Sequence, residues 1–111
     1  MASFEVIIAP RALEQLESYI DYIQYTLLNP VAAQSVWKDA LESERELSRV
    51  ADSLRYCDNP RLRELGYRLF SFKRHRYVML YRMEGKKVFV DAVYHQMQDY
   101  ENIFSKWVEE T

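Results

Sequence analysis

The side chains that could do chemistry in this sequence are concentrated between residues 61 and 87. Of the 15 basic and 17 acidic residues, nine basic and two acidic ones lie in this segment, which therefore carries +7 while the remainder carries −9. Arginine binds phosphates and carboxylates through paired hydrogen bonds, and aromatic rings stack on nucleobases. The segment thus suits an anionic partner, a nucleic acid or an acidic peptide, although a merely solvated basic hairpin would have the same composition. The cations that alternate with aromatic residues here are Arg68, Lys73, Arg74, Arg76, Arg82, Lys86 and Lys87.

Outside this segment the sequence offers few reactive groups. It contains no Gly-rich phosphate loop, no HExxH motif and no paired cysteines, and its two histidines and one cysteine are too scattered for a zinc site. We therefore expect neither a metal nor a cofactor. Cys57 is expected to be an inert core residue. His75 is expected in a solvated turn, and His95 to be a structural histidine bonded to Asp99 or to the backbone.

Length and composition indicate a single domain, residues 1–111. A chain that is 49% hydrophobic and 14% aromatic is not disordered, and no stretch approaches the roughly 18 apolar residues that would span a bilayer. The first residues lack the basic flank and apolar run of a signal peptide, and the lone cysteine permits no internal disulfide. We therefore expect a cytoplasmic protein with no membrane partner.

Two helices should support the basic segment. The run 3–8 is typical of a strand, and from Pro10 onward apolar residues recur at spacings of three and four as far as Leu27. Asn29-Pro30 ends this helix and starts a second one, from about Val31 to about Leu54. Because no real loop separates them, the helices should form an antiparallel hairpin on one face of a sheet. The apolar side chains expected to be buried there include Leu13, Ile20, Leu47 and Leu54.

The basic segment itself should form the sheet. Strands are predicted over 67–73, 76–83 and 87–95, and the last one is followed by a helix whose apolar residues begin at Tyr100 and that Asp99 could cap. The order of elements is β-α-α-β-β-β-α, an α+β arrangement. The period of two in the middle strand places four residues on one face: Arg76, Val78, Leu80 and Arg82.

Five local strings stand out in the sequence: Ile7-Ile8-Ala9-Pro10-Arg11-Ala12, Asn29-Pro30-Val31-Ala32-Ala33, Gly66-Tyr67-Arg68, Tyr77-Val78-Met79-Leu80-Tyr81-Arg82 and Tyr94-His95-Gln96-Met97-Gln98-Asp99-Tyr100. In this order and spacing they resemble the RelE/ParE superfamily of toxins from bacterial type II toxin–antitoxin modules, which take part in plasmid stabilization. The resemblance implies a β-α-α-β-β-β core in which a helical hairpin packs on a four-stranded antiparallel sheet. It also implies growth inhibition that a cognate antitoxin silences.

The superfamily divides by target, so the resemblance leaves open whether the chain is an enzyme. RelE-like members are metal-independent endonucleases that cut messenger RNA on the ribosome; here that activity would use Arg68, Arg76 and His95. ParE-like members are described as poisoning DNA gyrase. Val78 stands where RelE-like sequences usually place an arginine, so the pattern favours the ParE-like, non-nuclease alternative. A third alternative is an inactive relative that only binds the antitoxin and regulates its operon.

The resemblance and the charge pattern together predict the contact surface for target or antitoxin. An acidic, partly apolar antitoxin segment should lie along the basic strands, and the aromatic residues of the closing helix could extend that surface. The alternative for the closing helix is that it packs on its own domain. The predicted contact residues are Arg68, Lys73, Arg74, Arg76, Arg82, Tyr100, Phe104 and Trp107.

Overall fold

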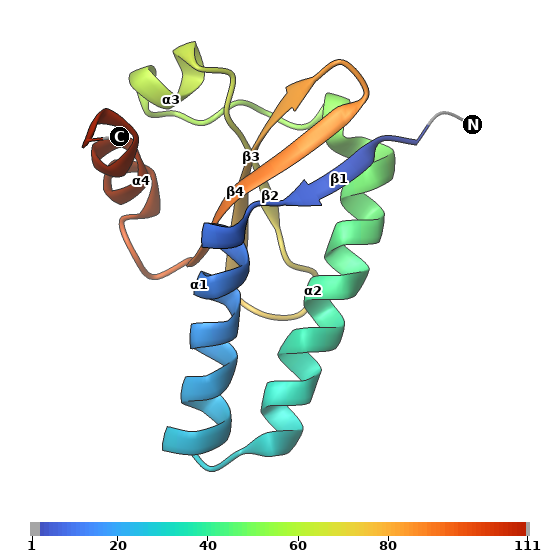
Figure 1. Cartoon of the computed structure of the whole chain (residues 1–111), viewed down its shortest axis with the longest axis vertical. Coiled ribbons are helices and arrows are strands. Elements are labelled where there is room, and N and C mark those ends of the chain that lie inside the picture. Colours follow the sequence, from blue (N-terminus) through green and yellow to red (C-terminus); the bar gives the residue numbers. More distant parts are fainter. Residues whose placement is uncertain (1–2, 111) are drawn as a thin grey trace.

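The computed structural model describes residues 3–110, and its elements follow the predicted order (Figure 1). The helices and strands are β1 (Glu5–Ile8), α1 (Pro10–Asp21), a π-helical segment (Tyr22–Thr26), α2 (Pro30–Val50), a 3₁₀ turn (Ala51–Ser53), α3 (Pro60–Glu64), β2 (Arg68–Ser71), β3 (Tyr77–Glu84), β4 (Lys87–His95) and α4 (Tyr100–Glu110). Sequence periodicity did not reveal the π-helical segment or α3. No helix in the described residues is long and apolar enough to cross a membrane.

The four strands form one sheet in the order β1-β4-β3-β2. The hairpin-connected strands β2, β3 and β4 are antiparallel, as predicted, but β1 runs parallel to β4, with Glu5 opposite Lys87. The sheet is therefore mixed, and the expectation of a wholly antiparallel sheet was wrong. The short turns between β2, β3 and β4 impose antiparallel pairing, whereas β1 is separated from β4 by the helices and by β2 and β3, so no turn sets its direction.

The helices α1 and α2 form the predicted antiparallel hairpin and cover one face of the sheet (Figure 1). Asn29 joins them as predicted, because its side-chain oxygen accepts a hydrogen bond from the amide of Ala32 at 3.1 Å. Leu47 is fully buried, and Ile20 and Leu54 pack against the same core. Leu13 is the exception at 39% exposed, because it lines an open hollow between the two helices whose other walls include Met79 and Val93 of the sheet.

The other face of the sheet is covered by α3 and α4. Phe104 of α4 is fully buried; its ring packs edge-on against Tyr67 at 5.0 Å and is stacked on Trp107 at 5.7 Å. The structure thus corrects the placement of Phe104 on a binding surface, since a fully buried ring belongs to the core. This layer brings Cys57 and Leu62 into contact with the sheet, so the cysteine is a core residue as predicted.

Candidate functional site

The basic residues between β2 and β3 form a turn, residues 72–76, that is fastened to α2; we call it the basic turn. The fastening point is Asp39, whose side chain is fully buried. Its Oδ2 accepts hydrogen bonds from the backbone amides of Arg74 (3.0 Å) and His75 (2.8 Å) and lies 2.9 Å from His75 Nδ1. On its other side His75 Nε2 lies 3.3 Å from Ser35 Oγ. His75 is therefore a half-buried anchor and not the solvated turn residue that the sequence suggested.

The cations of the basic turn remain near the surface. Lys73 Nζ lies 4.0 Å from Glu46 and an Arg74 nitrogen 3.7 Å from Glu42; both cations are exposed to solvent, and the two acids are partly exposed. Exposed pairs of this kind contribute at most about 1 kcal/mol, so an incoming carboxylate can replace the α2 acids at little cost. Arg76 is exposed, and its side chain makes no hydrogen bond or ion pair within residues 3–110. The basic turn thus presents three cations on a rigid support.

Arg68, at the start of β2, is bound to its own chain. Its guanidinium donates to the carbonyl of Leu54 and to the hydroxyl of Tyr56, both at 2.9 Å, and lies 4.3 Å above the Tyr56 ring. This arrangement joins the segment after α2 to the edge of the sheet, where Tyr56 and Arg68 also form a β-bridge. Arg68 therefore has a structural role that sequence reasoning missed.

Arg82 is also engaged internally, at an irregularity of the sheet. The pairing of β3 and β4 shifts between Leu80 and Tyr81, and Asp91 is the extra residue on β4. Asp91 Oδ2 accepts hydrogen bonds from Arg82 Nε at 3.0 Å and from the Tyr67 hydroxyl at 2.7 Å. Burial, and the hydrogen bond to Asp91, raise the pKa of Tyr67, so its hydroxyl remains a donor. Arg82 also pairs with Glu84 and stacks on Phe89.

The sheet register separates the three residues of the nuclease alternative. Arg68 pairs with Tyr81, in the middle of β3, whereas Arg76 precedes Tyr77, the first residue of β3 and the partner of His95. At roughly 3.3 Å per residue, Arg68 lies about 16 Å along the strand from Arg76. A general base and its charge-stabilising cations must reach one phosphate within hydrogen-bond distance. Arg68 therefore lies too far from Arg76 and His95 to act with them on one phosphate.

His95 lies beside the largest hollow of the site region. Its Nδ1 accepts a hydrogen bond from the Met97 amide at 3.1 Å, which confirms the predicted backbone contact and places the proton on Nε2. The hollow has a volume of about 490 Å³ and lies between the π-helical segment and the sheet. Burial, and the neighbouring Tyr94 and Tyr77, raise the pKa of Tyr19 in its wall to about 12. The lining residues are Ser18, Tyr19, Tyr22, Ile23, Leu27, Tyr77, His95 and Gln98.

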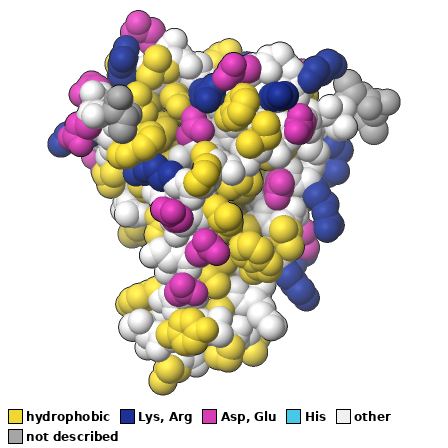
Figure 2. All heavy atoms as spheres, in the orientation of Figure 1, with side chains coloured by type: hydrophobic (Ala, Val, Ile, Leu, Met, Phe, Trp, Pro, Cys, Tyr) yellow, Lys and Arg dark blue, Asp and Glu magenta, His cyan; other side chains and the backbone are white. Residues whose placement is uncertain are grey.

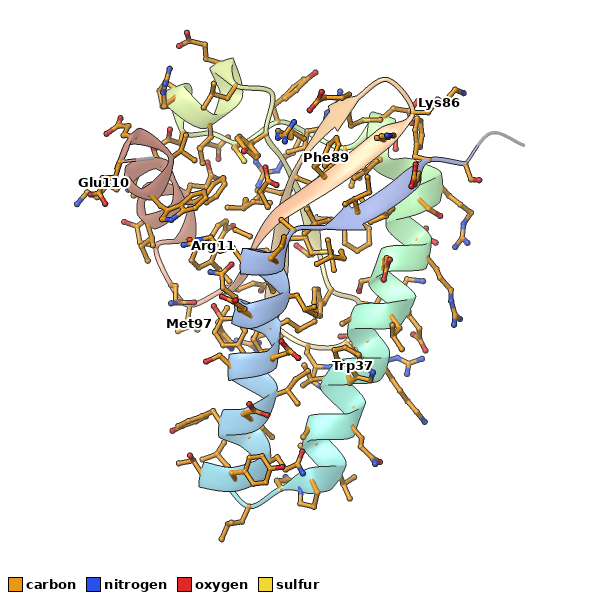
Figure 3. All side chains as sticks on the ribbon, in the orientation of Figure 1. Arg11, Trp37, Lys86, Phe89, Met97 and Glu110 are labelled. Carbon is orange, nitrogen blue, oxygen red and sulfur yellow. The ribbon has the colours of Figure 1, made fainter. Side chains whose placement is uncertain are left out.

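The aromatic residues of α4 are divided between core and surface. Phe104 is buried, whereas Tyr100 and Trp107 are half-buried. The guanidinium of Arg11 lies 4.2 Å from the centre of the Trp107 ring and donates to the Tyr94 hydroxyl at 3.3 Å. Figure 3 shows Arg11 at the start of α1, on the side that faces α4. This contact fixes α4 to the rest of the fold and favours the alternative in which the closing helix packs on its own domain.

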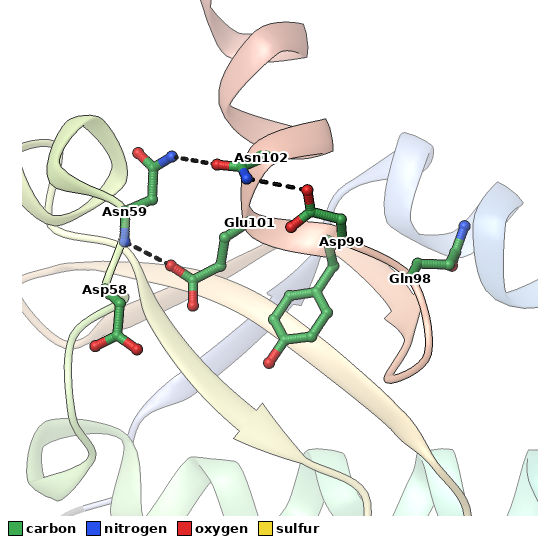
Figure 4. Close-up of a pocket in the computed structure, with 7 residues that line it drawn as sticks. Asp58, Asn59, Gln98, Asp99, Glu101 and Asn102 are labelled. Carbon is green, nitrogen blue, oxygen red and sulfur yellow. Dashed lines mark hydrogen bonds between the residues drawn. The ribbon is translucent and has the colours of Figure 1, made fainter.

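A separate acidic hollow of about 400 Å³ lies where α3 meets the start of α4 (Figure 4). Its polar groups are hydrogen-bonded to one another. The backbone amide of Asn59 donates to Glu101 at 2.7 Å, and the side-chain amide of Asn59 donates to Asn102 at 3.1 Å. Asn102 in turn donates to Asp99 at 3.0 Å. These contacts hold the two helices together. Across residues 3–110, no group of three His, Cys, Asp or Glu side chains could hold a metal ion.

Comparison with known proteins identifies the family to which this chain belongs. Residues 6–100 match the family described as the ParE toxin of the type II toxin–antitoxin system, parDE. The chain belongs to this family of ParE toxins. The fold of this toxin is similar to a solved chain described as the chromosomal ParDE system from P. aeruginosa, with a TM-score of 0.70 and 20% identity. That likeness covers 86% of this chain and 98% of the other. No curated protein is significantly similar in sequence.

Proposed function

We propose that this ParE-family toxin arrests growth by binding and inhibiting DNA gyrase or a comparable cytoplasmic protein, without cleaving RNA, and that a cognate antitoxin silences it. The observation that carries the proposal is the separation of Arg68 from Arg76 and His95. Arg68 and Arg82 are also held by their own chain, so neither is free to join Arg76 and His95 at one phosphate. Membership of the ParE family supports the same conclusion.

The antitoxin is proposed to be of the ParD kind, since the family is defined by the parDE pair. We place its acidic segment on the basic turn, where Lys73, Arg74 and Arg76 can exchange weak contacts with α2 for antitoxin carboxylates. We also propose that the half-buried rings of Tyr100 and Trp107 extend this surface. Such a segment would become ordered as it binds.

The test of the target uses two reactions in parallel. Purified toxin is incubated with gyrase and relaxed plasmid, and separately with translating ribosomes whose message ends are mapped. The proposal expects inhibition of supercoiling and uncut messages. Cut messages together with intact supercoiling would establish the RelE-like endonuclease instead. If induction of the chain causes no growth arrest, it is an inactive relative that binds only its antitoxin.

The antitoxin surface is tested by titration at low and high salt. Replacing Lys73, Arg74 and Arg76 by Ala should weaken the complex and reduce the salt dependence of its affinity. The reason is that dissolved salt screens the attraction between these exposed cations and the antitoxin carboxylates. Lys38→Ala on α2 is the matched control, since it removes an exposed cation outside the basic turn. Equal salt dependence in both variants would exclude the basic turn from the antitoxin interface.

A further inference from the structure

The end of the helical hairpin that projects beyond the sheet, residues 22–31, is an apolar surface that the fold does not cover (Figure 1). We call it the hairpin tip. Of the twelve large hydrophobic side chains exposed in residues 3–110, five lie in this short segment, each between 56% and 78% exposed. Apolar residues scattered singly over a surface are normal, whereas such a group marks an interaction site. The five are Tyr22, Tyr25, Leu27, Leu28 and Val31.

The backbone of the hairpin tip is ordered but strained. The π-helical segment closes with a hydrogen bond from the Leu27 amide to the Tyr22 carbonyl at 3.0 Å, and the Asn29 amide donates to the Ile23 carbonyl at 3.0 Å. Between them Leu28 has φ of +53°, a conformation that favours Gly or Asn at the end of a helix. Its side chain is 78% exposed, so core packing does not account for a leucine there. Strain retained at an exposed apolar residue points to a contact outside the chain.

Charge restricts what that contact can be. Between Arg11 and Lys38 the sequence contains no lysine or arginine, and its three acids, Glu14, Glu17 and Asp21, are all exposed on one side of α1. Figure 2 shows acidic side chains along the hairpin and hydrophobic ones gathered at its lower end. An acidic border disfavours nucleic acid, an anionic membrane and a second hairpin tip, and it repels the acidic antitoxin segment proposed for the basic turn. It favours a protein surface rich in Lys and Arg.

The hairpin tip also adjoins a hollow that can receive a partner's side chain. Tyr22, Ile23 and Leu27 form one wall of the 490 Å³ hollow, and Tyr77 and His95 form the other. The toxin therefore offers a partner both a projecting apolar tip and an adjacent apolar hollow. Such features are typical of binding hot spots, in which large aromatic side chains contribute most of the affinity.

We propose that the hairpin tip is the surface through which the toxin binds its cellular target, and that the target offers an apolar socket bordered by Lys and Arg. This assignment rests on the proposed function, because it assumes that the toxin binds a cellular target and an antitoxin through different surfaces. The basic turn binds the acidic antitoxin, and the acidic, apolar hairpin tip binds the basic target.

The experiment uses the full chain with the paired changes Tyr25→Ser and Leu28→Asn. Asn adopts positive φ readily, so the fold should be kept and the melting temperature should be equal or higher. Leu65→Asn is the matched control, because it removes an exposed leucine from the end of α3, at the opposite end of the molecule. A third variant, Asp21→Lys, reverses charge in the acidic border without touching the apolar side chains.

Growth arrest, gyrase inhibition and antitoxin affinity are then compared. We expect the paired variant to weaken gyrase inhibition by about 30-fold or more, to lose growth arrest, and to bind antitoxin within about twofold of wild type. Asp21→Lys should weaken inhibition less, and Leu65→Asn should leave it unchanged. Undiminished arrest by the paired variant, or an equal loss of antitoxin affinity, would overturn the assignment. Wild-type chain that causes no arrest would instead refute the proposed function, and the assignment with it.

Discussion

Removal of the Asp39 carboxylate should destabilise the toxin more than any surface change in the basic segment. Its Oδ2 accepts from two backbone amides and from His75, at distances between 2.8 and 3.0 Å, in a fully buried position. Asp39→Ala leaves both amides without an acceptor, which costs roughly 1–3 kcal/mol for each group that water does not reach. The gain from no longer burying a carboxylate offsets part of this cost. The expected net loss is about 3 kcal/mol, a large fraction of the stability of a domain of this size.

The assay is urea unfolding at pH 7, followed by far-ultraviolet circular dichroism. Asp39→Asn should lower the free energy of unfolding less, by about 1–2 kcal/mol, because the amide oxygen of Asn still accepts hydrogen bonds from the backbone. Asp21→Ala, an exposed carboxylate at the end of α1, serves as the control and should stay within about 0.5 kcal/mol of wild type. If Asp39→Ala also stayed within that margin, the basic turn would not be held by this carboxylate.

The further predictions concern Phe104, Arg68 and Cys57. Phe104→Ala should lower the free energy of unfolding by about 3–5 kcal/mol in the same urea assay, because it empties the core under α4; a loss confined to antitoxin affinity would contradict this. Arg68→Ala should cost about 1–3 kcal/mol through the lost bonds to Leu54 and Tyr56, whereas Arg76→Ala should leave the unfolding midpoint unchanged. Burial raises the pKa of the Cys57 thiol to about 12, so it should react slowly with a disulfide reagent at pH 8 and rapidly once urea unfolds the chain. The same shift predicts that stability falls as pH rises above about 9, since only the unfolded chain then ionises; a thiol that reacts at equal rates in both states would refute the burial.

Local sequence signals predicted the elements well. The range Lys87–His95 of β4 was predicted without error, and the Asn29-Pro30 junction was found because capping and a proline at the first helical position depend only on neighbouring residues. The apolar stripe of the first helix was also correct, yet its last part is π-helical and Leu13 is exposed. A spacing of three and four shows which side of a helix is apolar, but it does not show how far a partner covers that side.

The predicted site was found only in part. The basic segment was identified from charge alone, but the sequence did not show that Arg68 and Arg82 are bonded to their own chain while Arg76 remains exposed. Asp39 was missed because it and His75 are 36 positions apart and nothing local links them. The only sequence signal was an acid on the apolar side of the second helix, next to Ala40. An acid in such a place indicates a buried polar contact but does not identify its partner.

The sequence by itself determined the order of the elements, the α+β class, the resemblance to the toxin superfamily and the concentration of positive charge between residues 61 and 87. The order of the elements, the fold class and the charge follow from composition or from the spacing of neighbouring residues, whereas the resemblance rests on local strings such as Gly66-Tyr67-Arg68. The tertiary structure decided that β1 is parallel to β4, that Phe104 is a core residue, and that Arg68 is far from Arg76. It also divided the surface into a basic turn and an acidic, apolar hairpin tip. These features depend on register and long-range packing, which arise only when distant segments compete to bury the same apolar area.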